Sequence, residues 1–423
     1  MSGLHGILAA TKIDTGDTAW VLISAGLVMF MTPGLALFYG GMVRAKNVLG
    51  MLMQNFFALG IVSILWAVIG YSLAFGGRGW FVGNFDFAFM KDAVGRFPHG
   101  FHLSIPPGLF SGYQMMFAVI TPALITGAIA DRMRFKAWVW FIALWAVIVY
   151  SPVAHWVFSP DGWLFRRGAL DFAGGAVVHI NAGIAALAAV LVLGRRRGWP
   201  QHPTPPHSLP LTLIGTGILW FGWFGFNAGS ALAGNGVAVQ ALLNTHFAAA
   251  AGMCAWLIVE KVRMGHATTL GAASGAVAGL VAITPCAGYI SSMPALAVGA
   301  IAGAVCMFAV SWKMRFKYDD ALDVVGVHLV GGIIGTLLVG VFADVAVNAA
   351  GRNGLLHGGG LHLLGEQALA AVVVMAFSFA VTFVILKVLD RLLTGGLRVD
   401  QEEEEMGLDV TEHSETAYAY DRV

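Results

Sequence analysis

The sequence predicts an all-α membrane protein with eleven transmembrane helices. Of its 423 residues, 58% are apolar and only 11% are charged, and eleven stretches are each long and apolar enough to span a bilayer. Soluble proteins carry about 25% charged residues, so this chain has too few charges to cover a water-exposed surface. The composition excludes a disordered protein, a nucleic-acid-binding protein and a secreted protein rich in disulfides.

The eleven stretches share one composition. A helix needs roughly 20 predominantly apolar residues to cross a hydrocarbon layer about 30 Å thick, and none of the stretches contains Asp, Glu, Lys or Arg. They are rich in small residues, as helices that pack in lipid are, and they do not alternate as barrel strands do. In chain order the stretches are residues 20–41, 49–75, 107–130, 137–157, 172–194, 210–229, 237–259, 268–290, 293–312, 324–343 and 367–386.

Basic residues indicate how the chain is oriented. If the N-terminus lies outside, 17 of the 24 Lys and Arg residues fall in inner segments, as the positive-inside rule requires. We therefore expect a multi-pass protein of the cell (inner) membrane, with the N-terminus outside and the C-terminus cytoplasmic. The first 18 residues contain a single Lys, so we expect no cleavable signal peptide.

The chain divides into a transmembrane domain, residues 1–389, and a polar cytoplasmic tail, residues 390–423. The tail carries the acidic run Glu402–Glu405. Such a run is usually a solvated surface, and the alternative is a docking surface for a cytosolic partner.

Histidines are the ionisable residues that remain within the predicted spans: His155, His179, His246 and His328. An ionisable residue at membrane depth is a functional hypothesis by default, because lipid does not solvate it. A lone His on an apolar helix is nevertheless often a hydrogen-bonded packing residue. We favour that structural interpretation for His155 and His246.

The remaining two histidines occur in similar contexts. Asp171 stands directly before the span that contains His179, and Asp323 stands directly before the span that contains His328; each His is preceded by Val. The first span enters from outside and the second from inside, as an inverted repeat of spans 1–5 and 6–10 requires. If both Asp residues marked the membrane faces, a rise of 1.5 Å per residue would leave about 10 Å between the imidazoles. Contact between the rings therefore requires at least one buried Asp.

Two histidines on separate spans are compatible with haem or metal ligation, a proton relay or the lining of a pore. Metal sites usually have three or four ligands; no third candidate is evident, and the three cysteines lack metal-ligand spacing. We therefore expect no metal and no cofactor. A membrane redox protein with a bis-His haem is the alternative from another functional class.

Aromatic residues gather on two spans. Trp220, Trp223 and Phe226 recur every three residues near the outer end of the sixth span, and Tyr113 and Phe117 lie one turn apart on the third. Such residues usually serve packing or an interfacial belt. The alternative is a cation-binding vestibule, because each ring face attracts a cation by about 0.5–2 kcal/mol.

Six segments in one order complete the pattern: FYGGMVRAKN (38–47), DFAGGAVVHINA (171–182), WFGFNAGS (223–230), GAASGAVAGLV (271–281), DVVGVH (323–328) and GLDVT (407–411). With them the sequence resembles the ammonium transporter/Rhesus family, on the bacterial ammonium transporter side, over nearly its whole length. The resemblance implies a homotrimer of eleven-helix subunits, each with its own pore. It also implies transport of ammonium and methylammonium without enzymatic chemistry.

At the outer end, the resemblance assigns Phe117 and Phe226 to a stacked phenylalanine gate and Ser230 to the hydroxyl of an outer ammonium site. Asp171 matches a buried carboxylate near that site, which supports the fold and cation recruitment. Phe158 stands where bacterial members usually carry Trp. Because Phe is a weaker cation–π partner than Trp, we expect a weaker outer site here.

Further in, His179 and His328 match paired pore histidines that share a hydrogen bond, and Trp223, grouped with the outer site, packs beside the pore. The resemblance implies that NH4+ loses a proton at a dry constriction and continues as NH3, with or without separate proton transfer. Low dielectric disfavours any charge there, so K+ is excluded. The tail, with its segment 407–411, resembles a regulatory C-terminus that docks a P-II-type signalling protein. An ammonium sensor of the same fold is the nearest alternative.

Overall fold

The computed structural model describes residues 12–202 and 204–418. Within these residues the chain is helical and forms no β-strand, apart from one isolated bridge between Met133 and Arg398. Ten helices are long and apolar enough to cross a membrane. The prediction of an all-α protein with many spans is therefore confirmed. The first eleven residues, which bear on the signal-peptide prediction, and the last five residues of the tail lie outside the described residues.

Several spans are built from an α-helix that continues through a π-helical turn. The first five spans are α1 (Thr15–Met42), α2–η2–α3 (Val48–Leu65, Trp66–Gly70, Tyr71–Phe75), α4 (Pro107–Ile129), α5–η4–α6 (Phe135–Trp145, Ala146–Tyr150, Ser151–Phe158) and η5–α8 (Gly175–Ile180, Asn181–Leu193). The later helices are α9 (Leu209–Ala228), α10 (Gly236–Met264), α11 (Thr269–Ile283), α12 (Ser292–Ala309), η7–α14 (Val325–Leu329, Val330–Phe342) and α15 (His362–Leu392). Short helices are η1 (Ala45–Asn47), η3 (Ala88–Met90), α7 (Trp163–Arg167), η6 (Gly229–Ala231), α13 (Trp312–Phe316), η8 (Leu355–His357), α16 (Gln401–Met406) and α17 (Leu408–His413).

One predicted span differs from the others. The eighth stretch, 268–290, is helical only over the 15 residues of α11. The helix ends at Ile283, and Pro285, which has no backbone N–H to donate, follows two residues later. The described residues thus contain ten full-length candidate spans and this shorter apolar helix.

Glycines allow the helices to approach closely, as the composition predicted. A Cβ on Gly215 of α9 would lie 2.2 Å from the backbone nitrogen of Phe38 on α1, and one on Gly299 of α12 would lie 2.1 Å from the carbonyl oxygen of Ala248 on α10. Both distances are far inside van der Waals contact, so only glycine fits. In lipid the hydrophobic effect does not drive helices together. Close backbone packing of this kind stabilises helix pairs instead.

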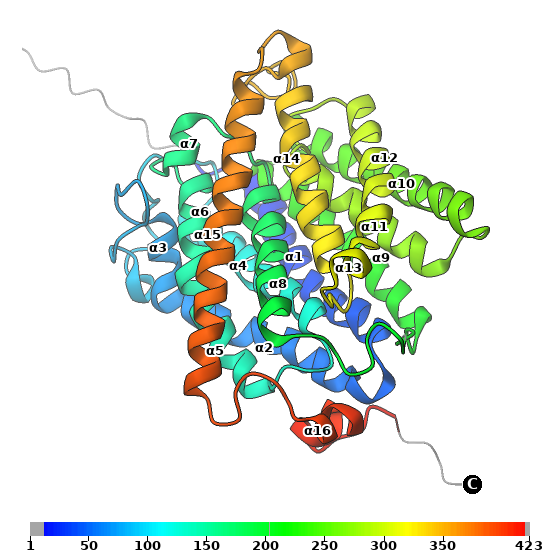
Figure 1. The fold of residues 1–423 in the computed structure, drawn as a ribbon. Coiled ribbons are helices and arrows are strands. Elements are labelled where there is room, and N and C mark those ends of the chain that lie inside the picture. Colours follow the sequence, from blue (N-terminus) through cyan, green and yellow to red (C-terminus); the bar gives the residue numbers. More distant parts are fainter. Residues whose placement is uncertain (1–11, 203, 419–423) are drawn as a thin grey trace, which may run out of the picture.

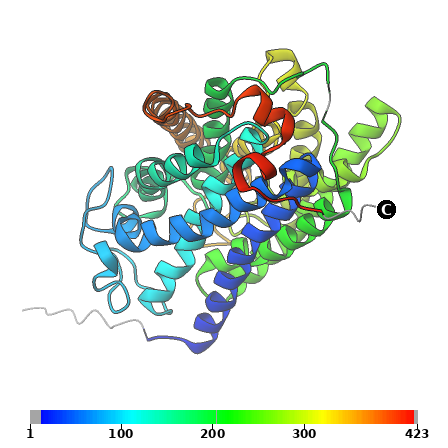
Figure 2. The same ribbon diagram turned by 90° about the horizontal axis from the view of Figure 1, so that it is seen from below.

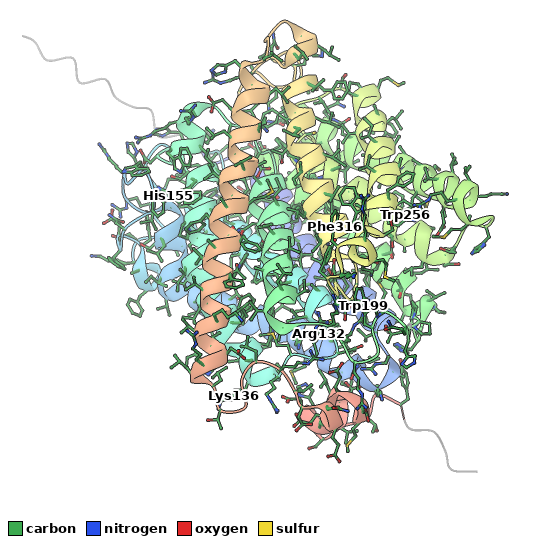
Figure 3. The ribbon with its side chains drawn as sticks, viewed as in Figure 1. Arg132, Lys136, His155, Trp199, Trp256 and Phe316 are labelled. Atoms are coloured by element: carbon green, nitrogen blue, oxygen red, sulfur yellow. The ribbon has the colours of Figure 1, made fainter. Side chains whose placement is uncertain are left out.

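The centre of the molecule is formed by η5–α8 and η7–α14, which contact each other and are covered on one side by α15 (Figure 1). Seen from below, the tail helices α16 and α17 lie across the ends of α1 and α2 (Figure 2). The loop between α14 and α15 and the short helix α7 lie at the opposite end (Figure 1). Arg132 and Lys136 lie toward the tail end (Figure 3), where the basic loops were predicted to be.

Ion pairs fasten the loops at the tail end. Arg196 donates through Nε and Nη2 to both carboxylate oxygens of Asp319, at 2.9 and 2.8 Å, and Arg132 lies 3.9 Å from the same carboxylate. Burial opposes ionisation of Asp319, but the hydrogen bonds from Arg196 and the charge of Arg132 outweigh burial and hold its pKa below the usual value. The loop after α8 is thereby joined to the loop before η7.

The tail folds back on the same loops. The Glu404 carboxylate accepts from the Arg197 backbone N–H at 2.7 Å and pairs with Arg398 at 2.6 Å, and it is 4% exposed. The interpretation of Glu402–Glu405 as a solvated surface is therefore wrong for Glu404, although Glu402 and Glu405 are exposed.

Candidate functional site

A cavity of about 320 Å³ opens at the end opposite the tail. Four predicted site residues, which come from four different segments, line it: Phe117, Phe158, Asp171 and Ser230. Phe158, the last residue of α6, faces the same space as Ser230 of η6. The structure thus brings the expected outer-site residues together.

The hydroxyl of Ser230 is held at the end of α9. Its Oγ donates to the carbonyl of Phe226 at 2.8 Å and lies 3.1 Å from the hydroxyl of Tyr113. The Tyr113 hydroxyl also lies 2.9 Å from the carbonyl oxygen of Gly225. The carbonyl of Gly225 also accepts from the Gly229 N–H, and that of Phe226 accepts from the hydroxyls of Ser230 and Tyr113. The Ser230 oxygen retains acceptor capacity on the side that faces the cavity.

Asp171 caps the π-helix η5. One carboxylate oxygen accepts from the N–H groups of Gly174 and Gly175 at 2.8 and 2.6 Å, and the other accepts from Ala176 and Val177 at 2.9 and 3.2 Å. The first N–H groups of a helix have no partners within it, and an anion there is favoured by the helix dipole. Asp171 therefore fixes the turn that carries His179 while its charge remains at the floor of the outer cavity.

Two phenylalanines close the cavity on its inner side. The rings of Phe117 on α4 and Phe226 on α9 have centroids 4.3 Å apart with an angle of 38° between their planes, and each residue is 1% exposed. Beyond Phe226 lies a second cavity of about 10 Å³, lined by apolar side chains with His179, Trp223 and His328. A space of this size holds about one water-sized molecule.

The two histidines meet in this second cavity. Nδ1 of His328 lies 3.3 Å from Nδ1 of His179, and the rings are nearly parallel, with an angle of 22° between their planes. The rings are thus far closer than the roughly 10 Å expected if both Asp residues marked membrane faces. Asp171 lines the outer cavity and Asp323 lines the inner one. Gly183 permits the crossing, since a Cβ there would lie 2.4 Å from the backbone nitrogen of Leu329.

The hydrogen bonds of Thr284 determine the tautomers of His179 and His328. Its hydroxyl donates to the carbonyl of Leu280 at 2.8 Å, so its oxygen accepts from Trp223 Nε1 at 2.9 Å and from His179 Nε2 at 3.3 Å. With the proton on Nε2, His179 presents a lone pair at Nδ1, and His328 Nδ1–H donates to it. The Nε2 atom of His328 is then left with a lone pair.

Trp223 does not belong to the outer site with which the prediction grouped it. Its indole lies on the inner side of Phe226, donates to Thr284 and stacks on His179 with ring centroids 5.5 Å apart. The sequence placed it at the same helix end as Phe226, but the direction of its N–H depends on α11, which sequence spacing does not reveal.

Two more cavities continue toward the tail. One of about 10 Å³ shares Phe38, Val277 and His328 with the histidine cavity. The next, of about 270 Å³, shares Met42, Leu322 and Asp323 with it and reaches the loop that carries Trp199. Together with the outer cavity they form a path through the chain that narrows at the phenylalanines and at the histidines.

His155 and His246 lie outside this path. The ring nitrogens of His155 lie 2.8 and 2.7 Å from the carbonyl oxygens of Ala74 and Gly79, which ties α6 to the end of α3. His246 is exposed on α10 and lies against Trp220, with ring centroids 5.4 Å apart. Within the described residues, no group of three or more His, Cys, Asp or Glu side chains is placed to hold a metal ion.

Comparison with known proteins gives one consistent result. The model of the Ammonium Transporter Family matches residues 19–418. The "Ammonium transporter" of Bacillus subtilis is 49% identical over 407 residues, which cover 96% of this chain and 99% of the relative. The "Ammonium transporter" of Mycobacterium tuberculosis is also 49% identical, covering 96% of this chain and 91% of the relative. The crystal structure of Candida albicans Mep2 superposes with a TM-score of 0.88 at 36% identity, covering 93% of this chain and 88% of that one.

Proposed function

The chain belongs to the ammonium transporter family, and we propose that it recruits NH4+ at the outer cavity, deprotonates it at the phenylalanine gate and conducts NH3 past the paired histidines. The observation that carries this mechanism is the path of four cavities, interrupted by the Phe117–Phe226 contact and narrowed to about 10 Å³ at the histidines. A pore this narrow and apolar has no room for a hydrated ion.

Recruitment uses groups that stabilise a cation without binding it tightly. NH4+ donates hydrogen bonds to the Ser230 hydroxyl oxygen, and the faces of Phe117 and Phe158 attract it. The charge of Asp171 adds a favourable field from the cavity floor, although its oxygens are engaged by backbone N–H groups.

Selectivity follows from the apolar lining beyond the gate. Moving a charge into such an environment is costly unless the group changes its protonation state. NH4+ can lose a proton and continue as a neutral molecule, whereas K+ cannot. The lone pair on His328 Nε2 accepts a hydrogen bond from NH3. If the proton crosses separately, this nitrogen takes it up while the Nδ1–H proton of His328 passes to His179 Nδ1.

We place the N-terminus outside, the C-terminus in the cytoplasm and the protein in the inner cell membrane, with α11 as the eleventh span and spans 1–5 and 6–10 as inverted repeats. The assembly is a homotrimer of such subunits. An exposed imidazole at membrane depth is costly in lipid, which supports a position for His246 at a subunit contact. The regulatory tail, residues 390–423, and the basic inner loops form the face for a P-II-type partner.

The haem alternative does not fit the site. The histidine nitrogens face each other at 3.3 Å, and the adjoining cavity of about 10 Å³ admits no porphyrin. The sensor alternative uses the same pore residues, so only a transport measurement distinguishes it.

The test is an assay in proteoliposomes that contain the full chain, with NH4+, methylammonium and K+ as separate substrates. Uptake of the first two without K+ flux is the expected result. Simultaneous electrical recording separates net NH4+ transport, which carries current, from electroneutral NH3 transport. Equal permeation of K+, or no ammonium uptake, contradicts the proposal.

A further inference from the structure

The outer cavity has two charged side chains in its wall, Asp171 and Arg352. Asp171 engages four backbone N–H groups. Arg352 comes from the loop between α14 and α15 and is exposed. Across residues 12–202 and 204–418, its guanidinium makes no hydrogen bond or ion pair. A cavity proposed to recruit a cation thus has an unpaired cation in its wall.

Arg352 is held against the wall by its surroundings. Gly168 has a φ of +92°, and a Cβ there would lie 2.5 Å from both Cζ and Nε of Arg352. The loop is itself ordered by hydrogen bonds: Asp344 N–H donates to the carbonyl of Tyr289 at 2.9 Å, and Val345 N–H donates to the side chain of Asn353 at 2.9 Å. The loop backbone that carries Arg352 is therefore ordered, and the guanidinium lies against Gly168 beside the cavity.

The carboxylates on the surrounding elements contact partners other than Arg352. These pairs are Asp161 with Arg166 at 2.5 Å, Glu366 with Arg167 at 2.8 Å, and Asp344 with His357 at 3.4 Å. The field of Arg352 therefore acts on the contents of the cavity.

We propose that Arg352 sets the affinity of the outer cavity for cations, because its positive charge lowers the occupancy of NH4+ and of other cations. This rests on the proposed function, since it concerns how the same cavity takes ammonium. Phe158 acts in the same direction, because it offers a weaker cation–π contact than Trp. Together the two residues give a low-affinity entrance ahead of a gate that only a deprotonated substrate passes.

The experiment compares the half-saturation concentration for ammonium in proteoliposomes of the full chain and three variants. Arg352→Gln removes the charge, Arg352→Lys keeps it, and Arg78→Gln removes an exposed outer charge that does not line the cavity. We expect Arg352→Gln to lower the half-saturation about two- to sixfold at low ionic strength, the range given by a unit charge at roughly 8 Å in a water-rich site. The effect shrinks as sodium chloride is added, and the other two variants behave like the wild type.

An unchanged or raised half-saturation in Arg352→Gln overturns the proposal. Equal changes in Arg352→Gln and Arg352→Lys also overturn it, because they indicate a packing role against Gly168. Ammonium binding to the purified proteins, measured as thermal stabilisation, separates this inference from the proposed function. If the wild type transports no ammonium, tighter ammonium binding by Arg352→Gln still supports the role of Arg352, and equal binding refutes it.

Discussion

His328 Nδ1 lies 3.3 Å from His179 Nδ1 although the residues are 149 positions apart in the chain. Each ring is carried by a π-helical turn, η5 or η7, and glycines bring these turns together. Two facing Nδ1 atoms share one proton, so the pair has a donor side and an acceptor side. This geometry makes the protonation of the two rings interdependent and leads to the first two predictions.

Replacing both His179 and His328 with Ala removes the polar groups from the narrowest part of the path. We expect the double variant to lose selective transport, because NH3 loses its hydrogen-bond partners and the enlarged space admits water. The measurement is methylammonium uptake together with K+ flux, with His266→Ala, an exposed site on the loop after α10, as the control. Wild-type methylammonium uptake in the double variant, with K+ still excluded, would contradict the role of the pair.

Thr284→Val removes the oxygen that accepts from Trp223 and His179. Two buried N–H donors then lack partners, at a cost of about 1–3 kcal/mol each, and the His179 tautomer is no longer fixed. We expect lower thermal stability and slower uptake, whereas Thr284→Ser, which keeps the hydroxyl, retains both. Slow uptake in the Ser variant as well would show that the methyl group of Thr284, and not its hydroxyl, is required.

The sequence points to residues that line the path of cavities, but not to the contacts that hold their side chains in place. The resemblance assigns Phe117, Phe158 and Ser230, and the two histidines are also visible as ionisable residues within apolar spans. The role of Thr284 was missed, because its partners Trp223 and His179 lie 61 and 105 positions away, and only tertiary packing brings them together.

The distance between the histidines could not be obtained from helix rise alone. That arithmetic depends on where each Asp lies in the membrane, and the sequence does not give that depth. Arg352 likewise stands in a loop whose sequence gives no sign that it returns to the outer cavity. The short helix α11 was predicted too long because the apolar composition continues past Pro285, where the helix does not.

Phe158→Trp restores the larger aromatic ring at the outer cavity. Indole is a stronger cation–π partner, and a gain of about 0.5–1 kcal/mol lowers the half-saturation for ammonium about two- to fivefold. Phe158→Leu, which removes the π face but keeps an apolar side chain, is expected to raise it. A half-saturation concentration for ammonium that does not fall in the Trp variant would contradict this role of residue 158.

Asp319→Asn breaks the bidentate pair with Arg196 and leaves this buried guanidinium only the longer ion pair with Asp131, at 3.7 Å. Removing one partner of a buried ion pair typically costs about 3–5 kcal/mol, so we expect a clear loss of thermal stability in detergent.

The pKa of Asp319 is lowered in the folded state, so its contribution to stability is present above the unfolded pKa of about 3.9 and is lost as the pH falls through the folded pKa. The wild type should therefore lose more stability than the Asn variant below about pH 4. If acid destabilises the two proteins equally, the loss of stability at low pH comes from other carboxylates.

The acidic run of the tail offers a matched pair of variants. Glu404 is buried between Arg197 and Arg398, whereas its neighbour Glu402 is exposed, so the two substitutions to Ala remove the same charge from different environments. We expect Glu404→Ala to release the tail from the inner loops, because a buried carboxylate that joins two segments is lost. Glu402→Ala should leave the tail docked, since an exposed charge contributes little to stability.

Limited proteolysis of the purified full chain measures this directly. Cleavage between α15 and α17 should be faster in Glu404→Ala than in the wild type and unchanged in Glu402→Ala, because proteases act on segments that open from the folded structure. The tail is also held by Asp409, whose carboxylate accepts from the Gly50 N–H at 2.8 Å, so Glu404→Ala combined with Asp409→Asn should be cleaved faster than either single variant. Equal cleavage of all these proteins would mean that the contacts of Glu404 and Asp409 do not hold the tail against the loops, and that other contacts, such as the ion pairs of Arg134 with Glu403 and Glu412, do so.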